Sequence, residues 1–497
     1  MINLRVFRRR GRMRYLWISL LLVSMLVVSQ WRIPAIAATA RHYTELTFGP
    51  LPEIQFPEYT RYQMRNGITV FLIENRELPL VNGTAMFHTG GRLEPADKIG
   101  LASLTGEVMR TGGTRQHPPA ELNQLLEQRA ASVETSIDTA VGQASFSGLS
   151  QDTEQILELF AEVLREPAFV PEQLELAKTQ RRGEIARRND NPDGIARREF
   201  QKLVYGNSSP YAWTIEYDTL DNIRREDLIN FYQQYFHPNN MILGIVGDFD
   251  TATMRRLLEE KFGNWQPSPE FRRPALPGVQ QANSGGVFVI DQPQLTQSNI
   301  LLGHLGGQLD SPDHAALTVM NEVLNGFGGR LFNEVRSRQG LAYSVYGFWN
   351  PRFDFPGTFI AGGQTRSEAT VPFIQSVMSE IERIRTAPIS AQELQYAKDS
   401  VLNSFVFNFQ DPSQVLARLM RYEYYGYPAD FIFQYQRGVE NTTIADIQRV
   451  ARTYLKPENM VTLVVGNNQA INPPLSSLAQ GTSVTSIDIT IPDRSST

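Results

Sequence analysis

The hydrophobic positions of the chain divide it into short strands and amphipathic helices. Residues 68–90, ITVFLIENRELPLVNGTAMFHTG, and residues 298–307, SNILLGHLGG, are rich in β-branched residues between turn-forming residues, and predict strands. Helical periodicity follows in TEQILELFAEVLREP at 153–167. The apolar runs at 241–248 and 460–467 then predict returning strands. Strands, helices and a returning strand indicate an α+β fold, with helices on one face of each sheet.

The chain also repeats itself. FYQQYFHPNNMILGIVGDFD, which begins at residue 231, returns as VARTYLKPENMVTLVVGNNQ, which begins at 450, so that Pro238 matches Pro457. The segment at 172–206 returns near 392–426, and HTGGRL at 88 is answered by HLGGQL at 304. Three matches in one order at nearly one period predict two copies of one domain.

The repeats define the expected domains. We expect residues 55–265 and 287–480 to form two tandem homologous domains, each a mostly antiparallel sheet packed with helices. Residues 266–286 contain four prolines and three glycines, which favours a semi-extended linker. The Ser/Thr-rich residues 481–497 are predicted to form a disordered tail.

The N-terminus has the layout of a secretory signal. The first fifteen residues carry six arginines and no acid, and the apolar run WISLLLVSMLVV at 17–28 precedes the small residues Ala35 and Ala37. A helix of that length spans only about 18 Å, against roughly 30 Å for a bilayer core. We therefore expect residues 1–37 to be a cleaved signal peptide, with an uncleaved signal anchor as the alternative. Either one predicts an exported protein of the periplasm or cell envelope.

Charge and composition exclude several classes of function. Residues 1–37 contain seven arginines and no other charged residue, so their removal changes the formal net charge from −5 to −12. An acidic exported body is a poor nucleic-acid binder. The absence of cysteine excludes disulfides, thiolate zinc ligands and a cysteine nucleophile. None of the six histidines lies four residues from another, so no helical pair of zinc-binding imidazoles is present.

Three blocks carry a family resemblance: GGRLEPADKIGLASLT, then SPYAWTIEYDTLDNI with FYQQYFHPNNMILGIVGDFD, then GGRLFNEVRSRQGLAYSVYGFW. Their order on a duplicated chain resembles the pitrilysin or insulinase-like zinc metallopeptidases, which include the mitochondrial processing peptidase. The resemblance covers about residues 55–480 and implies that the two domains form a clam-like pair.

Active members of this family carry the inverted zinc motif His-x-x-Glu-His in the helix that corresponds to GLASLTGEVMRTGGT, residues 100–114. The resemblance places Ser103 at the first histidine, Gly106 at the catalytic glutamate and Glu107 at the second histidine. It places Glu184 at the third ligand, where a glutamate is retained, although we favour a solvated carboxylate among arginines at this position. The resemblance therefore implies no catalytic residue and no metal site in this chain.

The second repeat keeps a different part of the family pattern. The resemblance assigns Arg336 and Tyr343 to substrate binding, because such a pair donates hydrogen bonds to a substrate backbone in working members. From the residues alone, the favoured interpretation is that Arg336 pairs with a carboxylate such as Glu334 and that Tyr343 is a half-buried strand residue.

These observations predict a zinc-free, substrate-handling subunit of a heteromeric pitrilysin-type metallopeptidase. It would be inactive alone and bind no cofactor, and it would hold extended peptides for cleavage by a homologous partner subunit that carries zinc. One alternative is a non-proteolytic scaffold like the core subunits of the cytochrome bc1 complex. A self-sufficient metallopeptidase is a third hypothesis, which the absence of a histidine pair disfavours.

Overall fold

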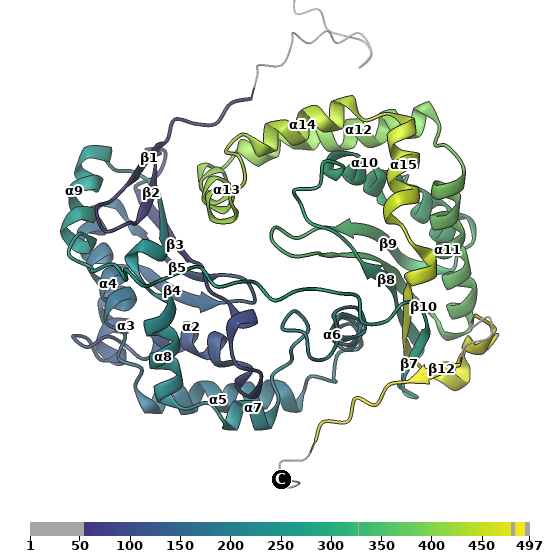
Figure 1. The fold of residues 1–497 in the computed structure, drawn as a ribbon, viewed down its shortest axis with the longest axis horizontal. Coiled ribbons are helices and arrows are strands. Elements are labelled where there is room, and N and C mark those ends of the chain that lie inside the picture. The colour runs from purple at the N-terminus through teal and green to yellow at the C-terminus, as the bar shows by residue number, and fades with distance from the viewer. Residues whose placement is uncertain (1–53, 327, 479–482, 493–497) are drawn as a thin grey trace, which may run out of the picture. The chain divides into compact units, whose positions relative to one another are not determined.

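The structure is a computed structural model that describes residues 54–326, 328–478 and 483–492 (Figure 1). The predicted signal peptide or anchor at 1–37 lies outside the described residues, as do 481, 482 and 493–497 of the predicted tail. Within the described ranges, no helix combines the length and the apolar character needed to cross a membrane.

The first half builds one six-stranded sheet with its helices. Its elements are β1 (Thr60–Gln63), β2 (Thr69–Glu74), β3 (Leu80–Phe87), α2 (Leu101–Thr111), α3 (Pro119–Glu127), β4 (Ser132–Ile137), β5 (Gly142–Leu149), α4 (Thr153–Arg165), α5 (Pro171–Ala186), α6 (Pro192–Tyr205), α7 (Tyr217–Asp221), α8 (Arg225–Tyr235), β6 (Met241–Gly247) and α9 (Thr251–Phe262). The strand order is β1-β2-β6-β3-β5-β4, and only the β2–β6 pair is parallel.

The second half builds the second sheet. Its elements are β7 (Val287–Asp291), β8 (Gln297–Leu305), α10 (His314–Asn325), the π-helical segment η6 (Phe332–Arg338), β9 (Ala342–Asn350), β10 (Thr358–Arg366), α11 (Thr370–Thr386), α12 (Ala391–Phe405), α13 (Pro412–Tyr425), α14 (Phe431–Asn441), α15 (Ile444–Tyr454), β11 (Val461–Gly466) and β12 (Val484–Ser486). The order is β12-β7-β11-β8-β10-β9, with β7 parallel to both β11 and β12.

The two sheets repeat one topology. The parallel pair β2–β6 corresponds to β7–β11, and β3, β5 and β4 correspond to β8, β10 and β9. Strands β4 and β9 therefore lie at equivalent outer edges. This arrangement confirms the predicted α+β fold and the duplication.

Each half contributes one helix that packs on the sheet of the other half. Helix α6 of the first half packs on β8 and β11 of the second sheet, and α13 of the second half packs on β6 of the first (Figure 1). The two helices are repeat equivalents, and each begins with a proline after a capping residue, Asn191 or Asp411, whose side chain accepts backbone N–H bonds. Each buries apolar residues against the foreign sheet. The exchange makes both cores depend on both halves.

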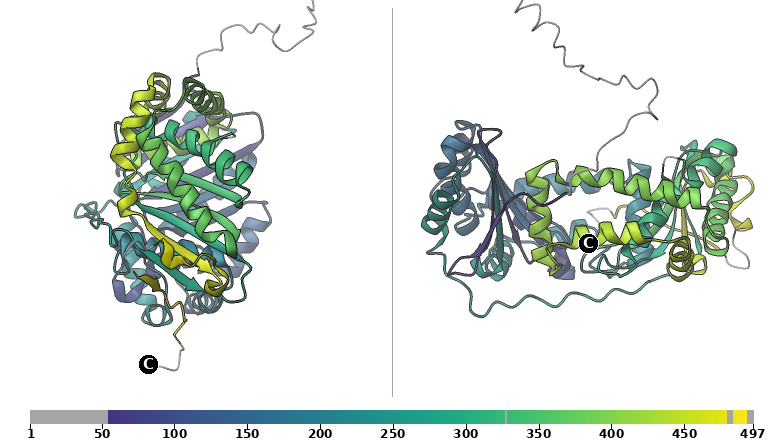
Figure 2. Two further views of the ribbon diagram at one scale, coloured as in Figure 1. Left: turned by 90° about the vertical axis from the view of Figure 1, so that its right-hand side faces the viewer. Right: turned by 90° about the horizontal axis from the view of Figure 1, so that it is seen from above.

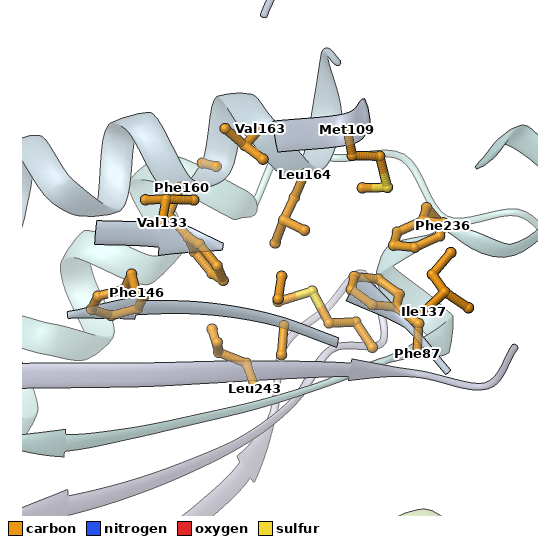
Figure 3. Close-up of a cluster of buried hydrophobic side chains, with 14 of the residues drawn as sticks. Phe87, Met109, Val133, Ile137, Phe146, Phe160, Val163, Leu164, Phe236 and Leu243 are labelled. Carbon is orange, nitrogen blue, oxygen red and sulfur yellow. The ribbon is translucent and has the colours of Figure 1, made fainter. Parts of the chain in front are cut away.

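The core of the first half lies between its sheet and the helices α2 and α4. Figure 3 shows Met109 of α2 and Phe160 and Leu164 of α4 facing side chains of the sheet, including Phe146 and Leu243. Burial of this apolar face fixes α2, the helix that the resemblance matches to the zinc helix, against the sheet.

The predicted linker and the predicted C-terminal tail differ in structure. Residues 266–286 contain no helix or strand and form a long connection between the halves (Figure 2). The prediction of disorder for the tail is wrong for Val484–Ser486, which form β12 beside β7. Ile487 and Ile489 pack against the core that contains α6. The alternating isoleucines of SIDITIP follow β12 and supply the apolar contacts that the Ser/Thr-rich composition obscured.

Candidate functional site

Helix α2 begins at a buried acidic cap. Gly100 has a left-handed φ of +106°, and the Glu94 carboxylate accepts hydrogen bonds from the backbone N–H groups of Gly100 (2.9 Å) and Ala102 (2.7 Å). Burial raises the pKa of Glu94 to about 7, while the two backbone hydrogen bonds act to lower it. The cap satisfies N–H groups that the first turn of the helix leaves without partners.

At Gly106, α2 touches the outer strand of the sheet. A Cβ atom placed on Gly106 would lie 2.5 Å from the Ile137 nitrogen, 2.7 Å from the Ser136 carbonyl carbon and 2.9 Å from the Ser136 Cα atom. The Thr135 hydroxyl donates a hydrogen bond of 2.5 Å to the Gly106 carbonyl oxygen. Because backbone atoms occupy this space, the position that the resemblance matches to the catalytic glutamate has no room for a side chain.

Glu107 and Glu184, which the resemblance matches to the second histidine and the third ligand, are linked through an arginine. The Arg181 guanidinium on α5 donates to Glu107 Oε2 (2.8 Å) and to both Glu184 carboxylate oxygens (2.9 and 3.0 Å). Arg181 and Glu107 are about three-quarters buried, with 24% and 27% of their side chains exposed, whereas Glu184 is 63% exposed. A guanidinium cation therefore links the two carboxylates that the resemblance assigns to metal-ligand positions.

The residues at these positions do not fit zinc. The Ser103 hydroxyl donates to the Gly100 carbonyl oxygen at 3.0 Å, and Gly106 offers no side chain. Glu107 and Glu184 bond to a group that has N–H donors only and cannot bind a metal. Within the described ranges, no group of three or more His, Asp or Glu side chains could hold a metal ion. This arrangement has the character of a structural helix contact.

In the second half, the structure brings Arg336 and Tyr343 together. The Arg336 guanidinium carbon lies 5.1 Å from the centroid of the Tyr343 ring and 4.8 Å from that of Phe332. Glu334 accepts hydrogen bonds from Arg338 and Gln339, so the alternative in which Arg336 pairs with Glu334 is wrong. Arg336 therefore lies against two aromatic rings, and no ion pair joins it to a carboxylate of the described residues.

Tyr343 owes its position to a bulge in β9. The register between β9 and β10 shifts between Gln364 and Thr365, which leaves Tyr343 as the extra residue of the strand. Its side chain is 82% exposed, and the alternative prediction of a half-buried strand residue is therefore wrong. The bulge presents a phenol to solvent at the outer edge of the second sheet.

The exposed face of β9 is aromatic. Tyr346 and Phe348 stack with ring centroids 5.8 Å apart. They line a cavity of about 540 Å³ together with Ile360 of β10 and Arg197 of α6. The outer edge of β9 is partly covered, because the Asn325 and Asn321 side chains of α10 bond to the backbone N–H and C=O groups of Gly347 and Trp349. An extended chain can pair with this edge on the Tyr343 side of Gly347.

The sequence identified the positions that the resemblance matches to the zinc motif. It did not identify Arg181 and Glu94, whose contacts account for the structure around these positions. Arg181 stands in the basic run RRGEIARR, where nothing distinguishes it from its neighbours. The signal for Gly106 was its place inside a helix, since glycine there usually marks a close approach. Glu94 could have been found as an acid shortly before a predicted helix start.

Two family models match the chain. The model described as "Insulinase (Peptidase family M16)" matches residues 70–210, and the model described as "Peptidase M16 inactive domain" matches residues 222–401. Together they span most of both halves.

Relatives match over nearly their whole length. The "Non-peptidase homolog YmxG" of Helicobacter pylori is 25% identical over 408 residues, which are 81% of this chain and 92% of that protein. The "Zinc protease PqqE" of the same organism is 23% identical and covers 82% and 92% of the two chains.

Solved structures share the fold. A Pseudomonas fluorescens "peptidase M16 inactive domain" superposes with a TM-score of 0.72 and 25% identity, covering 86% of this chain and 99% of that one. The first half of the periplasmic protease PqqL of Escherichia coli superposes with a TM-score of 0.69 at 18% identity, covering 84% and 93%. With its duplicated fold and its replaced zinc motif, the chain belongs to the insulinase, or M16, family of peptidases.

Proposed function

We propose that this protein is the zinc-free, substrate-handling subunit of a heteromeric M16 peptidase. It holds an extended peptide, and a homologous subunit with an intact His-x-x-Glu-His motif cuts it. The observation that carries the proposal is the asymmetry between the halves. The positions of α2 that the resemblance matches to the zinc motif have a backbone contact at Gly106 and a guanidinium at Glu107, whereas Arg336 and Tyr343 lie together near the start of the outer strand β9.

The chemistry of the pair suits a peptide backbone. A guanidinium and a phenol both donate hydrogen bonds to a carbonyl oxygen, and to the oxyanion that forms from it during hydrolysis. Tyr343 is solvent-exposed, and Arg336 has no carboxylate partner among the ion pairs of the described chain. Both donors are therefore available to a ligand.

Strand β9 supplies the sheet edge to which an extended peptide would add. As the last strand of its sheet, it has an outer row of backbone N–H and C=O groups. The Asn325 and Asn321 side chains of α10 occupy this row at Gly347 and Trp349, so a peptide would pair with the part of the edge nearer Tyr343. Peptide addition there would give affinity with little sequence specificity, and the aromatic cavity beside Tyr346 would favour apolar side chains.

The proposal includes export to the periplasm or cell envelope. It rests on the secretory layout of residues 1–37 and on the periplasmic location of PqqL, whose solved half shares this fold. If the signal is not cleaved, residues 17–28 would associate the protein with a membrane.

The test is reconstitution with a zinc-bearing M16 subunit encoded beside this chain. Arg336→Ala and Tyr343→Phe should each lower kcat/KM of the complex by roughly 100- to 1000-fold if the donor acts in the transition state. Donors that only hold the ground-state backbone should cost about tenfold or less and act mainly through KM. Arg366→Ala, on the exposed end of β10, is the control and should leave activity unchanged.

A structural scaffold is the second candidate, and the exchange of α6 and α13 favours it because each half packs a helix on the sheet of the other. The same experiment separates the two functions. If both the Arg336 and Tyr343 variants form complexes with full activity, the peptide-handling proposal fails and the scaffold becomes the better account.

A further inference from the structure

A second cavity, separate from β9, lies on the side of α13 that faces away from the first sheet. It has a volume of about 340 Å³, and we call it the α13 cavity. Its walls come from α13, α10, α14 and the loop between β9 and β10. Volumes of roughly 300 Å³ mark the lower end of small-molecule sites, which suits a ligand of amino-acid size.

Aromatic rings form a large part of the walls of the α13 cavity. Phe353, Tyr422, Phe431 and Tyr435 line it, and the His314 ring stacks on Tyr435 with centroids 5.0 Å apart. Burial lowers the pKa of His314 to about 4, so that the ring is neutral at physiological pH. The interior of the cavity therefore offers flat apolar surfaces to a ligand.

The mouth of the cavity is cationic. Arg418 and Arg421 line it, and its lining contains no aspartate or glutamate. Arg418 donates to the Asn408 carbonyl oxygen (3.1 Å) and to Asn408 Oδ1 (2.7 Å), both of which are neutral acceptors. The Arg421 guanidinium lies over the Phe353 ring at 5.7 Å. Neither arginine forms an ion pair with a carboxylate of the described chain.

The two arginines also repel each other. Burial is the largest cause that lowers the pKa of Arg418, and the charge of Arg421 lowers it further. Two neighbouring cations beside a buried aromatic wall, with no internal anion, form a site that an external anion would stabilise.

We propose that the α13 cavity binds a monocarboxylate with an aromatic body, with its ring between Phe353, Phe431 and Tyr435 and its carboxylate on Arg421 and Arg418. Aromatic walls favour a flat ring through stacked and edge contacts. A guanidinium binds a carboxylate through paired charge-assisted hydrogen bonds. Both a free aromatic acid and the C-terminal residue of a peptide present this chemistry.

The cavity also borders the contact between the halves. Phe353 is followed by Asp354, whose carboxylate accepts hydrogen bonds from the buried Arg92 of the first half at 3.0 and 2.6 Å. A ligand on Phe353 would thus touch the loop that carries this ion pair.

The test is calorimetric titration of the whole protein, without any partner subunit, with N-acetylphenylalanine and its amide. We expect the acid to bind and the amide to bind at least tenfold more weakly. Arg421→Gln should weaken binding of the acid by roughly 10- to 100-fold and leave the weak binding of the amide unchanged. Arg437→Gln, an exposed arginine of α14 outside the cavity, is the control and should bind like the wild type.

A second variant fills the space directly. Ala417 is exposed on α13 and lines the cavity, so Ala417→Trp should fold normally and abolish binding of the acid. The peptide Ala-Ala-Ala-Ala-Phe with a free C-terminus identifies the source of the ligand. Binding of this peptide together with the acid indicates a peptide terminus, and binding of the acid alone indicates a small molecule.

Three results would overturn the proposal: no binding of the acid at millimolar concentration, equal binding of acid and amide, or unchanged binding in both the Arg421 and Ala417 variants. Because no catalytic partner enters the experiment, its failure would leave the proposed peptidase role untouched.

Discussion

At the residue scale, Gly106 fixes the distance between α2 and the outer strand. Glycine inside a helix normally costs about 1 kcal/mol relative to alanine. Here the Cβ atom of an alanine would meet the backbone of Ser136 and Ile137 at 2.5 to 2.9 Å. We therefore expect Gly106→Ala to destabilise the protein by about 1 to 3 kcal/mol, as overpacking does elsewhere.

Urea unfolding measures this effect, and Gly183→Ala on α5 is the matched control. Its Cβ atom would meet only an Arg187 side-chain nitrogen at 4.0 Å, so the substitution should be neutral or stabilising. If Gly106→Ala stabilises the protein as much as Gly183→Ala, the steric account of the lost base position is wrong.

The contrast between Ser103 and Arg181 shows what the sequence can and cannot predict about the candidate site. The loss of the zinc-motif residues is visible in one helix, because the motif has fixed spacing. The role of Arg181 depends on how α5 packs against α2, and two helices 70 residues apart along the chain set that distance only in the folded protein. The proximity of Arg336 to Tyr343 could be predicted from the sequence, because the two residues lie on adjoining elements.

At the element scale, the Glu94 cap makes the stability of α2 depend on pH. The pKa of Glu94 is about 7 in the folded protein and near 4.5 when unfolded. Between those values the unfolded carboxyl loses its proton while the folded one keeps it, so stability falls as pH rises from about 4.5 to 7 and then levels off. The full effect is on the order of 3 kcal/mol.

Glu94→Gln should remove most of this decline, although it also loses one acceptor for the α2 backbone and so lowers stability at acidic pH. The measurement is the free energy of unfolding at several pH values from 4.5 to 8. Glu154→Gln, at an exposed carboxylate, should keep the wild-type profile. A Glu94→Gln profile parallel to that of the wild type would contradict the assignment.

Helices α6 and α13 show what the sequence does not predict about an element, which is the sheet that it packs on. The amphipathic patterns of α6 and α13 identify two helices in equivalent places of the repeats, and their capping residues set their starts. The patterns do not say which sheet receives each apolar face, because both sheets offer similar β-branched surfaces. The repeat predicted two tandem domains with mostly antiparallel sheets, whereas the strand order and the exchange of helices are properties of the folded protein.

At the scale of the whole molecule, two ion pairs join the halves in different surroundings. Arg92–Asp354 is mostly buried, with 4% and 18% of the side chains exposed, whereas Arg61–Glu423 is open, with 47% and 31% exposed. Removing one partner of a buried pair leaves an unpaired charge and costs about 3 to 5 kcal/mol. An exposed pair contributes about 1 kcal/mol or less.

We therefore expect Asp354→Ala to lower the free energy of unfolding by several times as much as Glu423→Ala. Thermal and urea unfolding of both variants give the comparison. Equal effects would mean that burial of Arg92 does not couple the halves.

The central claim is that the zinc helix of the family has become a structural helix, with Arg181 between the carboxylates that remain. The most direct measurement is the zinc content of the protein purified without chelator and dialysed against micromolar zinc, together with peptide hydrolysis by the same sample. We predict well under one zinc per chain and no chelator-sensitive hydrolysis, because Ser103, Gly106 and Glu107 cannot supply two ligands and a base. One tightly held zinc per chain with chelator-sensitive cleavage would contradict this account.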